Sequence, residues 1–166
     1  MNIAHIVKGR TVLAPLFATL TLVAILGSGL MAGLFFAFST AVMAALARLP
    51  DGQGAAAMNA VNVVILNPVF LTVFMGMTVV ALALGARSVF DWSQPGSAWL
   101  LAGSLFYVVG IFGVTAVFNV PLNDALAAAP GDAQVWSRYL AEWVPWNHVR
   151  TLAGLAALAC FAMARQ

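Results

Sequence analysis

Side chains that can bind a ligand or accept a proton are rare in this sequence, and most of them fall in three short stretches. The stretches contain Asn59, Asn62 and Asn67; Asn119 and Asn123; and Asn147, His148 and Arg150. Asparagine both donates and accepts hydrogen bonds, whereas arginine carries a permanent positive charge and five N–H donors. This combination of side chains is suited to holding an anionic or phenolic oxygen atom.

Spacing indicates which of these side chains share a helix face. Asn147 and Arg150 are three residues apart, and Asn119 and Asn123 are four apart, so each pair is predicted to share a face. His148 is the candidate base, because histidine titrates near neutral pH. It points about 100° away from Asn147 around a helix, which leaves open whether it faces a pocket, the solvent or the membrane interface.

Several chemistries are excluded by the residues at hand. His5 and His148 lie at opposite ends of the chain and Cys160 is the single cysteine, so we expect no metal site, no haem and no cofactor. No phosphate-binding loop and no Ser-His-Asp set is recognisable. No carboxylate lies in the middle of an apolar stretch, which argues against a proton-coupled transporter. The basic residues are scattered, which predicts no nucleic-acid partner.

The composition requires an apolar environment for these polar groups. Of the 166 residues, 63% are hydrophobic and only 7% are charged. A soluble domain would have about a quarter of its residues charged, so the surface of this chain cannot face water on all sides. The sequence therefore predicts an integral membrane protein in contact with the lipid bilayer.

The distribution of charge predicts the helices that must position the polar groups. Three stretches carry no charged residue: 11–47, 52–86 and 92–123. Each exceeds the roughly 20 residues that a helix needs to cross a bilayer. The fourth, 151–164, is too short, so the last helix must begin earlier, near Pro145, a residue favoured in the first turn. We expect an all-α, four-helix up-down bundle forming a single domain, 1–166, with spans at roughly 12–40, 60–86, 97–119 and 145–164.

The segment between the third and fourth spans has its own pattern. Asp132 is placed to cap a short helix that ends at Trp143, and the apolar side chains of that helix repeat at helical spacing: Trp136, Tyr139, Leu140 and Trp143. Tryptophan and tyrosine at this density predict a short interfacial helix lying at the headgroup level. A lid over a pocket is the alternative.

Four spans place both termini on one side of the membrane. Lys8, Arg10, Arg87 and Arg165 then lie on the side of the termini, against Arg48 and Arg138 on the other, with Arg150 set aside as functional. The positive-inside rule favours cytoplasmic termini. The excess of arginine over lysine hints at a GC-rich bacterial genome, and hence at a multi-pass protein of the cell inner membrane.

Four segments together resemble the anthrone oxygenase-like membrane family. They are the run from Gly33 to Ser39, the run from Asn62 to Phe70, the Asn-x-Pro-Leu-Asn element at 119–123, and the segment from Trp143 to Thr151 with its Trp-Asn-x-x-Arg element. Members of this family from fungal polyketide pathways oxidise anthrones to anthraquinones with oxygen and no known cofactor, and most bacterial members have no assigned substrate. The resemblance thus implies a membrane-embedded, cofactor-independent oxygenase for a planar aromatic, anthrone- or quinone-like substrate.

Resemblance and residue chemistry point to the same side chains. The expected catalytic residues are Arg150, Asn147, His148, Asn119 and Asn123; the expected substrate-binding residues are Asn62, Asn67, Phe35, Phe38, Trp143 and Trp146. Arginine at the positive end of a helix supplies potential for an anion, and aromatic rings form a slot for a flat substrate. Two alternatives stay open: a non-enzymatic accessory subunit, in a homo-oligomer or a larger membrane complex, and a binder of a lipophilic small molecule without turnover.

Overall fold

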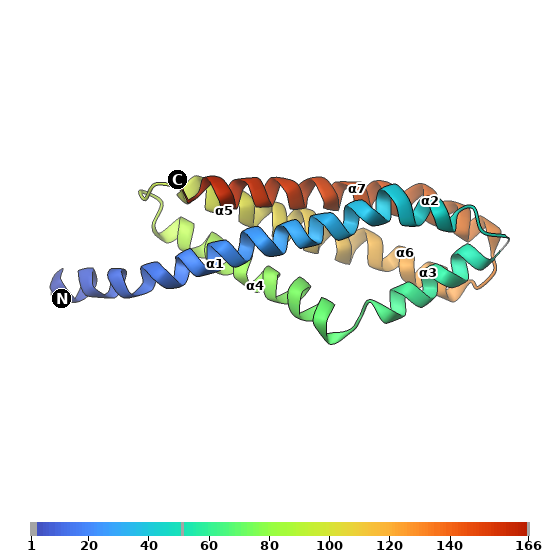
Figure 1. Cartoon of the computed structure of the whole chain (residues 1–166), viewed down its shortest axis with the longest axis horizontal. Coiled ribbons are helices and arrows are strands. Elements are labelled where there is room, and N and C mark those ends of the chain that lie inside the picture. Colours follow the sequence, from blue (N-terminus) through green and yellow to red (C-terminus); the bar gives the residue numbers. More distant parts are fainter. Residues whose placement is uncertain (1–2, 51, 166) are drawn as a thin grey trace.

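The computed structural model is all-helical over the residues it describes, 3–50 and 52–165, with side chains from Pro15 onward (Figure 1). The side chains of His5, Lys8 and Arg10 lie outside that description. Its elements form four helical rods, in which η marks a π-helical turn. The first is α1 (Ile3–Ala37), η1 (Phe38–Val42) and α2 (Met43–Leu46); the second is α3 (Gln53–Val64) and α4 (Pro68–Phe90); the third is α5 (Ser97–Tyr107), η2 (Val108–Gly113), η3 (Thr115–Asn119) and α6 (Val120–Ala128); the fourth is α7 (Ala133–Met163).

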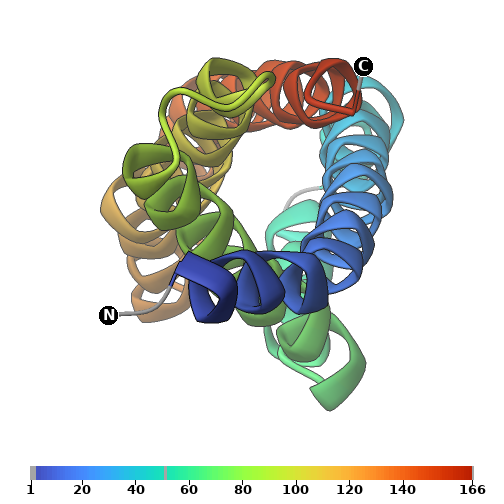
Figure 2. The same cartoon turned by 90° about the vertical axis from the view of Figure 1, so that its left-hand side faces the viewer.

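The rods lie side by side and form a ring when viewed along their length (Figure 2). In this ring α1 packs against α4 and α7, and α5 also packs against α4 and α7. Farther along, α3 contacts α2 and α6, and α6 contacts α7. The start of α1 and the end of α7 lie at the same end of the molecule (Figure 1).

Three helical stretches within the described residues are long and apolar enough to cross a membrane: Pro15–Leu46, Pro68–Phe90 and Ser97–Ala128. Their outward side chains are apolar, and several are mostly exposed in the isolated chain, among them Leu26, Val79 and Val109. Exposed apolar surface on this scale indicates a membrane protein. The first and third stretches run farther than the predicted 12–40 and 97–119, and α7 is not one of the three.

The second rod is broken where the sequence predicts one span from residue 60. Helix α3 ends at Val64 and α4 begins at Pro68. Pro68 has no N–H to continue a helix, and Asn67 caps the new one by accepting a hydrogen bond from the N–H of Phe70 at 3.0 Å. The Asn67 amide also donates to the carbonyl of Val64 at 3.1 Å. The predicted beginning of this span was wrong because it ignored the start signal carried by Asn67 and Pro68.

Helix α7 is one uninterrupted element, so the predicted separate interfacial helix is wrong. Asp132 does cap the start, accepting hydrogen bonds from the N–H groups of Gln134 and Val135 at 2.8 and 3.1 Å. The helix then continues through Pro145. Tyr139 and Trp143 are buried against residues of α3 and α6, such as Met58, Leu122 and Leu126. Burial of these rings explains why the segment packs against the other helices of the protein as a continuous part of α7.

The opposite face of this part of α7 is polar. Arg138 donates to Glu142 at 2.8 Å, four residues on, and both side chains are exposed. The hydrogen bond from Arg138 lowers the pKa of Glu142. Exposed pairs of this kind contribute little to stability, so this pair marks a solvated face.

Close contact between the first and fourth rods depends on Gly154. A Cβ atom added to Gly154 would lie 2.9 Å from the Cβ of Ala32 on α1. By contrast, a Cβ atom added to Gly33 would have no other atom within 4 Å. Small residues at an interface let helix backbones approach in membranes, and here Gly154 has that role.

Candidate functional site

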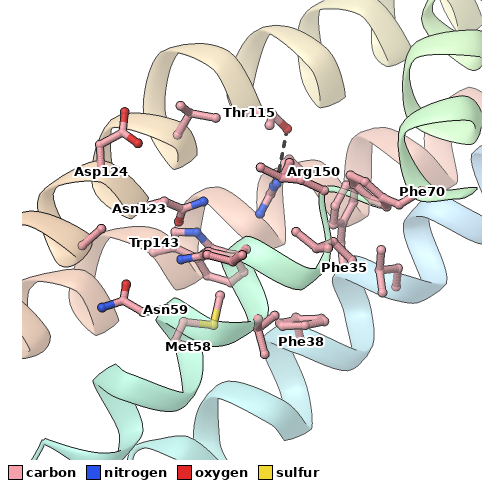
Figure 3. A pocket seen from close by; sticks show the side chains of 18 residues that line it. Phe35, Phe38, Met58, Asn59, Phe70, Thr115, Asn123, Asp124, Trp143 and Arg150 are labelled. Carbon is pink, nitrogen blue, oxygen red and sulfur yellow. Dashed lines mark hydrogen bonds between the residues drawn. The ribbon is translucent and has the colours of Figure 1, made fainter. Parts of the chain in front are cut away.

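A cavity of about 520 Å³ lies where the three polar stretches meet (Figure 3). Its walls come from α1 and η1, α3, the start of α4, the end of the third rod, and α7. The polar lining residues are Asn59, Asn62, Thr115, Asn123, Asp124 and Arg150; the aromatic lining residues are Phe35, Phe38, Phe70 and Trp143. This size is typical of sites for small organic molecules.

Arg150 points into the centre of this arrangement (Figure 3). The residue is only 5% exposed. Its Nη1 donates to Oγ1 of Thr115 at 3.2 Å, and its Nη2 donates to Oδ1 of Asn147 at 2.5 Å. Both acceptors are neutral, and no ion pair of Arg150 occurs within the described residues. A buried cation without a carboxylate is costly, which marks this group as a place for an anionic partner.

Aromatic rings surround the guanidinium. Its Cζ atom lies 4.3 Å from the ring centroid of Phe35 and 5.1 Å from that of Trp143. The rings of Phe38 and Trp143 are 6.2 Å apart between centroids. The ring faces stabilise the cation in part. They also give the cavity flat apolar walls directly beside a positive charge.

Four buried polar atoms of the cavity residues have no hydrogen-bond partner within the described chain. They are Nε of Arg150, Nε1 of Trp143, Oδ1 of Asn59 and Nδ2 of Asn62. Leaving such an atom unpaired costs about 1–3 kcal/mol, so each is a candidate for a further partner such as water or a bound molecule. Two of the donors stand on α7, and one donor and one acceptor stand on α3.

The cavity opens sideways. Val63 and Leu66, next to the break between α3 and α4, both line it and are 74% and 61% exposed. Val120 and Asp124 of α6 also line it and are exposed. Residues that are both lining and exposed mark the mouth, which therefore lies between the α3–α4 break and α6, on the apolar outer surface.

The structure brings together six of the residues that the sequence proposes for the site. Arg150, Asn123, Asn62, Phe35, Phe38 and Trp143 all line the cavity. Oδ1 of Asn123 also accepts a hydrogen bond from the hydroxyl of Tyr139 at 2.8 Å, so α7 fixes the amide. The shared level of the three polar stretches, inferred from an up-down topology, is thus present in the fold.

Two proposed residues lie just behind the wall. The amide nitrogen of Asn147 donates to the carbonyl of Phe35 and to Oγ of Ser39, both at 2.6 Å. The amide nitrogen of Asn119 donates to the carbonyl of Trp143 at 3.4 Å. Neither residue lines the cavity, so both position other groups and do not face a ligand.

Three proposed residues are not brought to the cavity. His148 is exposed on another side of α7, which answers the question its helical angle left open. Trp146 stacks on Phe118 with ring centroids 3.6 Å apart, and Asn67 serves as the cap of α4. Among the described side chains, the cavity lining therefore has no imidazole, and the direct hydrogen bonds of Arg150 go to Thr115 and Asn147, not to the asparagines of α3, η3 and α6.

Two of the three π-helical turns found in the described part of the chain contribute to the wall. Phe38 belongs to η1 and Thr115 to η3. Such turns are rare and concentrate at functional sites. η3 ends just before Pro121, whose missing N–H would interrupt a regular α-helix, and the wider turn lets the rod continue to Ala128.

Sequence reasoning missed several lining residues. Thr115 lies four residues before Asn119, but its contact with Arg150 requires the packing of α7 on η3. Met58 and Phe70 are apolar and carry no local signal of a site. The structure places Asp124, which follows Asn123 directly, at the mouth of the cavity. Among the described residues no three His, Cys, Asp or Glu side chains gather as a metal site would require.

Fold and cavity together define a helical membrane protein with a lateral, aromatic-walled pocket around one buried arginine. The sequence model of the anthrone oxygenase family matches residues 69–160, more than half of the chain. The chain belongs to this family. The match covers α4 to α7, with Thr115, Trp143 and Arg150, whereas Phe35, Phe38 and Asn59 lie before it. No curated protein and no solved structure matches the chain.

Proposed function

We propose that this protein is a membrane-embedded, cofactor-independent oxygenase that acts on a planar aromatic, anthrone- or quinone-like substrate. The observation that carries the proposal is the guanidinium of Arg150, buried without a carboxylate between the rings of Phe35 and Trp143. A flat anion fits both features, since the charge attracts its oxygen and the rings pack against its face. Membership of the anthrone oxygenase family supports the same class of substrate.

The proposed reaction consumes only the substrate and oxygen and uses no cofactor. An anthrone loses a proton from the carbon between its rings, and the electron pair spreads over the rings to the oxygen as an enolate. The carbanion reduces O₂ and binds it, and the proton returns to give a hydroperoxide on that carbon. Loss of water, with cleavage of the O–O and remaining C–H bonds, leaves the quinone carbonyl. One anthrone and one O₂ thus yield one anthraquinone and one water.

Different residues of the cavity bind different oxygen atoms of the substrate. Nε of Arg150 and Nε1 of Trp143 are free to donate to the enolate oxygen. Oδ1 of Asn59 accepts a phenolic hydroxyl on the opposite wall. Positive potential at the oxygen favours the ionised substrate, which is the intermediate that reacts with O₂.

The proton acceptor must differ from the one expected from the sequence. His148 is exposed and outside the cavity, so it does not reach a bound substrate. Asp124 is the carboxylate in the cavity lining, at the mouth, and we assign it the role of base (Figure 3). Its position apart from Arg150 keeps the carboxylate from neutralising the guanidinium.

For the membrane topology we propose four spans, with the fourth formed by α7 from about Pro145 onward and both termini in the cytoplasm of a bacterial cell. The packing of α7 between α1 and α5 supports this arrangement. Single cysteines at Gln53 and Gln94, both exposed, in a Cys160→Ala background should label from opposite sides of the inner membrane. Labelling of both from one side would exclude this topology.

A second candidate, a binder without turnover, is favoured by one observation: the described lining of the cavity holds neither an imidazole nor a thiol. A binder needs the charge and the rings but no proton acceptor. Oxygen uptake, compared with ligand binding, separates the two candidates.

The deciding experiment measures oxygen uptake and quinone absorbance with purified protein and a panel of anthrones, before and after treatment with a metal chelator. Wild type should oxidise at least one hydroxylated anthrone equally well in both conditions. The Arg150→Gln variant should not, whereas Arg138→Gln, at an exposed arginine of the same helix, should match wild type. Binding without oxygen uptake would favour the binder. Absence of both binding and uptake would leave an accessory subunit as the explanation.

A further inference from the structure

A second hollow, of about 360 Å³, lies at the other end of the molecule, near the start of the α1 span and the end of α7 (Figure 1). Its lining includes Phe17 and Thr21 of α1, Arg87 near the end of α4, Ser97 at the start of α5, and Arg165. Phe17, Arg87 and Ser97 lie at or near one end of each of the three candidate membrane spans, and Arg165 follows the end of α7. The hollow is therefore at the boundary where lipid headgroups are found.

The two arginines are brought to this hollow by separate features. The Cζ atom of Arg87 lies 4.0 Å from the ring centroid of Phe17, and its Nε lies 3.1 Å from Oδ2 of Asp91. Arg165 follows Ala164, whose carbonyl oxygen lies only 2.6 Å from where a Cβ of Gly96 would be. Gly96 also has a φ of +82°, a backbone conformation that favours glycine. Both the lack of space for a Cβ atom and this positive φ therefore favour glycine at this position, where the end of α7 packs against the turn between α4 and α5.

The charges of the hollow do not cancel. Among the described lining residues, two guanidinium groups and one carboxylate, that of Asp91, border the hollow, which leaves a surplus positive charge in this part of the lining. Helix α5, 11 residues long, begins at Ser97 with no side-chain cap, so the positive end of its dipole adds to that surplus. The side chain of Arg87 is 27% exposed, so it is reachable from outside.

We propose that this hollow binds a phosphate-bearing anion, held by Arg87 and Arg165. The apolar lining residues Phe17, Ala18 and Leu100 offer a surface for the uncharged part of such a molecule. Basic pockets between membrane helices recognise anionic headgroups in this way. A lipid headgroup and a free phosphate share the chemistry, and the proposal does not depend on the reaction in the first cavity.

The test is a titration of the purified full-length protein, in a non-ionic detergent, with short-chain phosphatidylglycerol, with the corresponding phosphatidylcholine, and with inorganic phosphate. Binding is measured by the shift in the thermal unfolding midpoint and by lipid retained in native mass spectrometry. Wild type should retain phosphatidylglycerol in preference to phosphatidylcholine. Protection by inorganic phosphate alone would identify the free anion as the ligand.

Four variants make the test specific. Arg165→Gln and Arg87→Gln should each weaken binding about fivefold, the effect of one basic group on an anionic lipid. Arg48→Gln is the matched control, since Arg48 is exposed at the opposite end of the molecule and should leave binding unchanged. Asp91→Asn should tighten binding, because it removes the competing carboxylate. Equal losses in all three arginine variants, or equal retention of the two lipids by wild type, would overturn the proposal.

Discussion

Arg150 and Asn147 are joined by a hydrogen bond of 2.5 Å between Nη2 of the guanidinium and Oδ1 of the amide, one turn apart on α7. The amide nitrogen of the same asparagine donates to the carbonyl of Phe35 and to Ser39 on the first rod. Asn147 therefore ties the first rod to the guanidinium and fixes the direction in which Arg150 points. In the proposed function Arg150 contacts the substrate, whereas Asn147 is a positioning residue.

Replacement of Arg150 by glutamine should lower turnover or ligand affinity about 10²-fold, because a charge-assisted contact with the anionic oxygen is lost. Thermal unfolding should show little loss of stability, since a buried charge without a counter-ion is removed at the same time. Arg138→Gln on the exposed face of α7 is the control. A folded Arg150→Gln protein with wild-type rate and affinity would show that the site is misplaced.

The Asn147→Ala change should act first on stability. It leaves the Phe35 carbonyl and one guanidinium nitrogen without partners, which costs about 1–3 kcal/mol. We expect a lower unfolding midpoint in detergent and a reduced rate in the folded fraction, because Arg150 loses its orientation. Asn67→Ala, at a cap outside the cavity, should reduce stability without changing the rate of the folded protein. Equal rates for folded Asn147→Ala and wild type would contradict the positioning role.

Trp143→Phe separates two roles of one side chain. The ring remains, but the buried Nε1–H, which has no partner within the described chain, is removed. Stability without ligand should stay the same or rise, since an unpaired buried donor is costly. Affinity for a phenolate or enolate ligand should fall about tenfold, the free energy of roughly one hydrogen bond. Trp146→Phe, outside the cavity, should leave affinity unchanged. Unchanged affinity in Trp143→Phe would mean that this donor does not contact the ligand.

Gly154→Ala should destabilise the protein by about 1–3 kcal/mol, the usual cost of inserting a methyl group into a packed interface. The added Cβ would lie 2.9 Å from the Cβ of Ala32 and force the first and fourth rods apart. Gly33→Ala is the matched control, because nothing lies within 4 Å of its added Cβ. Unfolding midpoints of the two variants should therefore differ, with Gly33→Ala close to wild type. Similar midpoints would refute the close contact.

Much of the site could be predicted from the sequence because polar residues are so scarce. An apolar chain cannot leave amides and a guanidinium in lipid without partners, so the ends of three helices had to face one another. The resulting groups include Asn62, Asn123 and Arg150 in one cavity. The direction of His148 could not be predicted, because it depends on which face of α7 packs against its neighbours.

Two other features carry no local signal. The aromatic spacing of Tyr139 and Trp143 fits a headgroup anchor and a buried helix equally well, and only the positions of α3 and α6 decide between them. A π-helical turn such as η3 has no composition of its own, so the register that places Thr115 beside Arg150 is not visible in the sequence. Pro145 favours a helix start, yet the packing on both sides of it kept α7 continuous.

The cavity mouth lies between Val63, Leu66 and α6, and this position determines which ligand concentration controls binding. A molecule that arrives through the apolar surface is drawn from the bilayer, so its mole fraction in lipid or detergent determines occupancy, and its concentration in water does not. Apparent KM values should then rise as more detergent is added at fixed total substrate, by simple surface dilution. Comparisons among anthrones will reflect the chemistry of the pocket only after each compound has been corrected for its own partition coefficient.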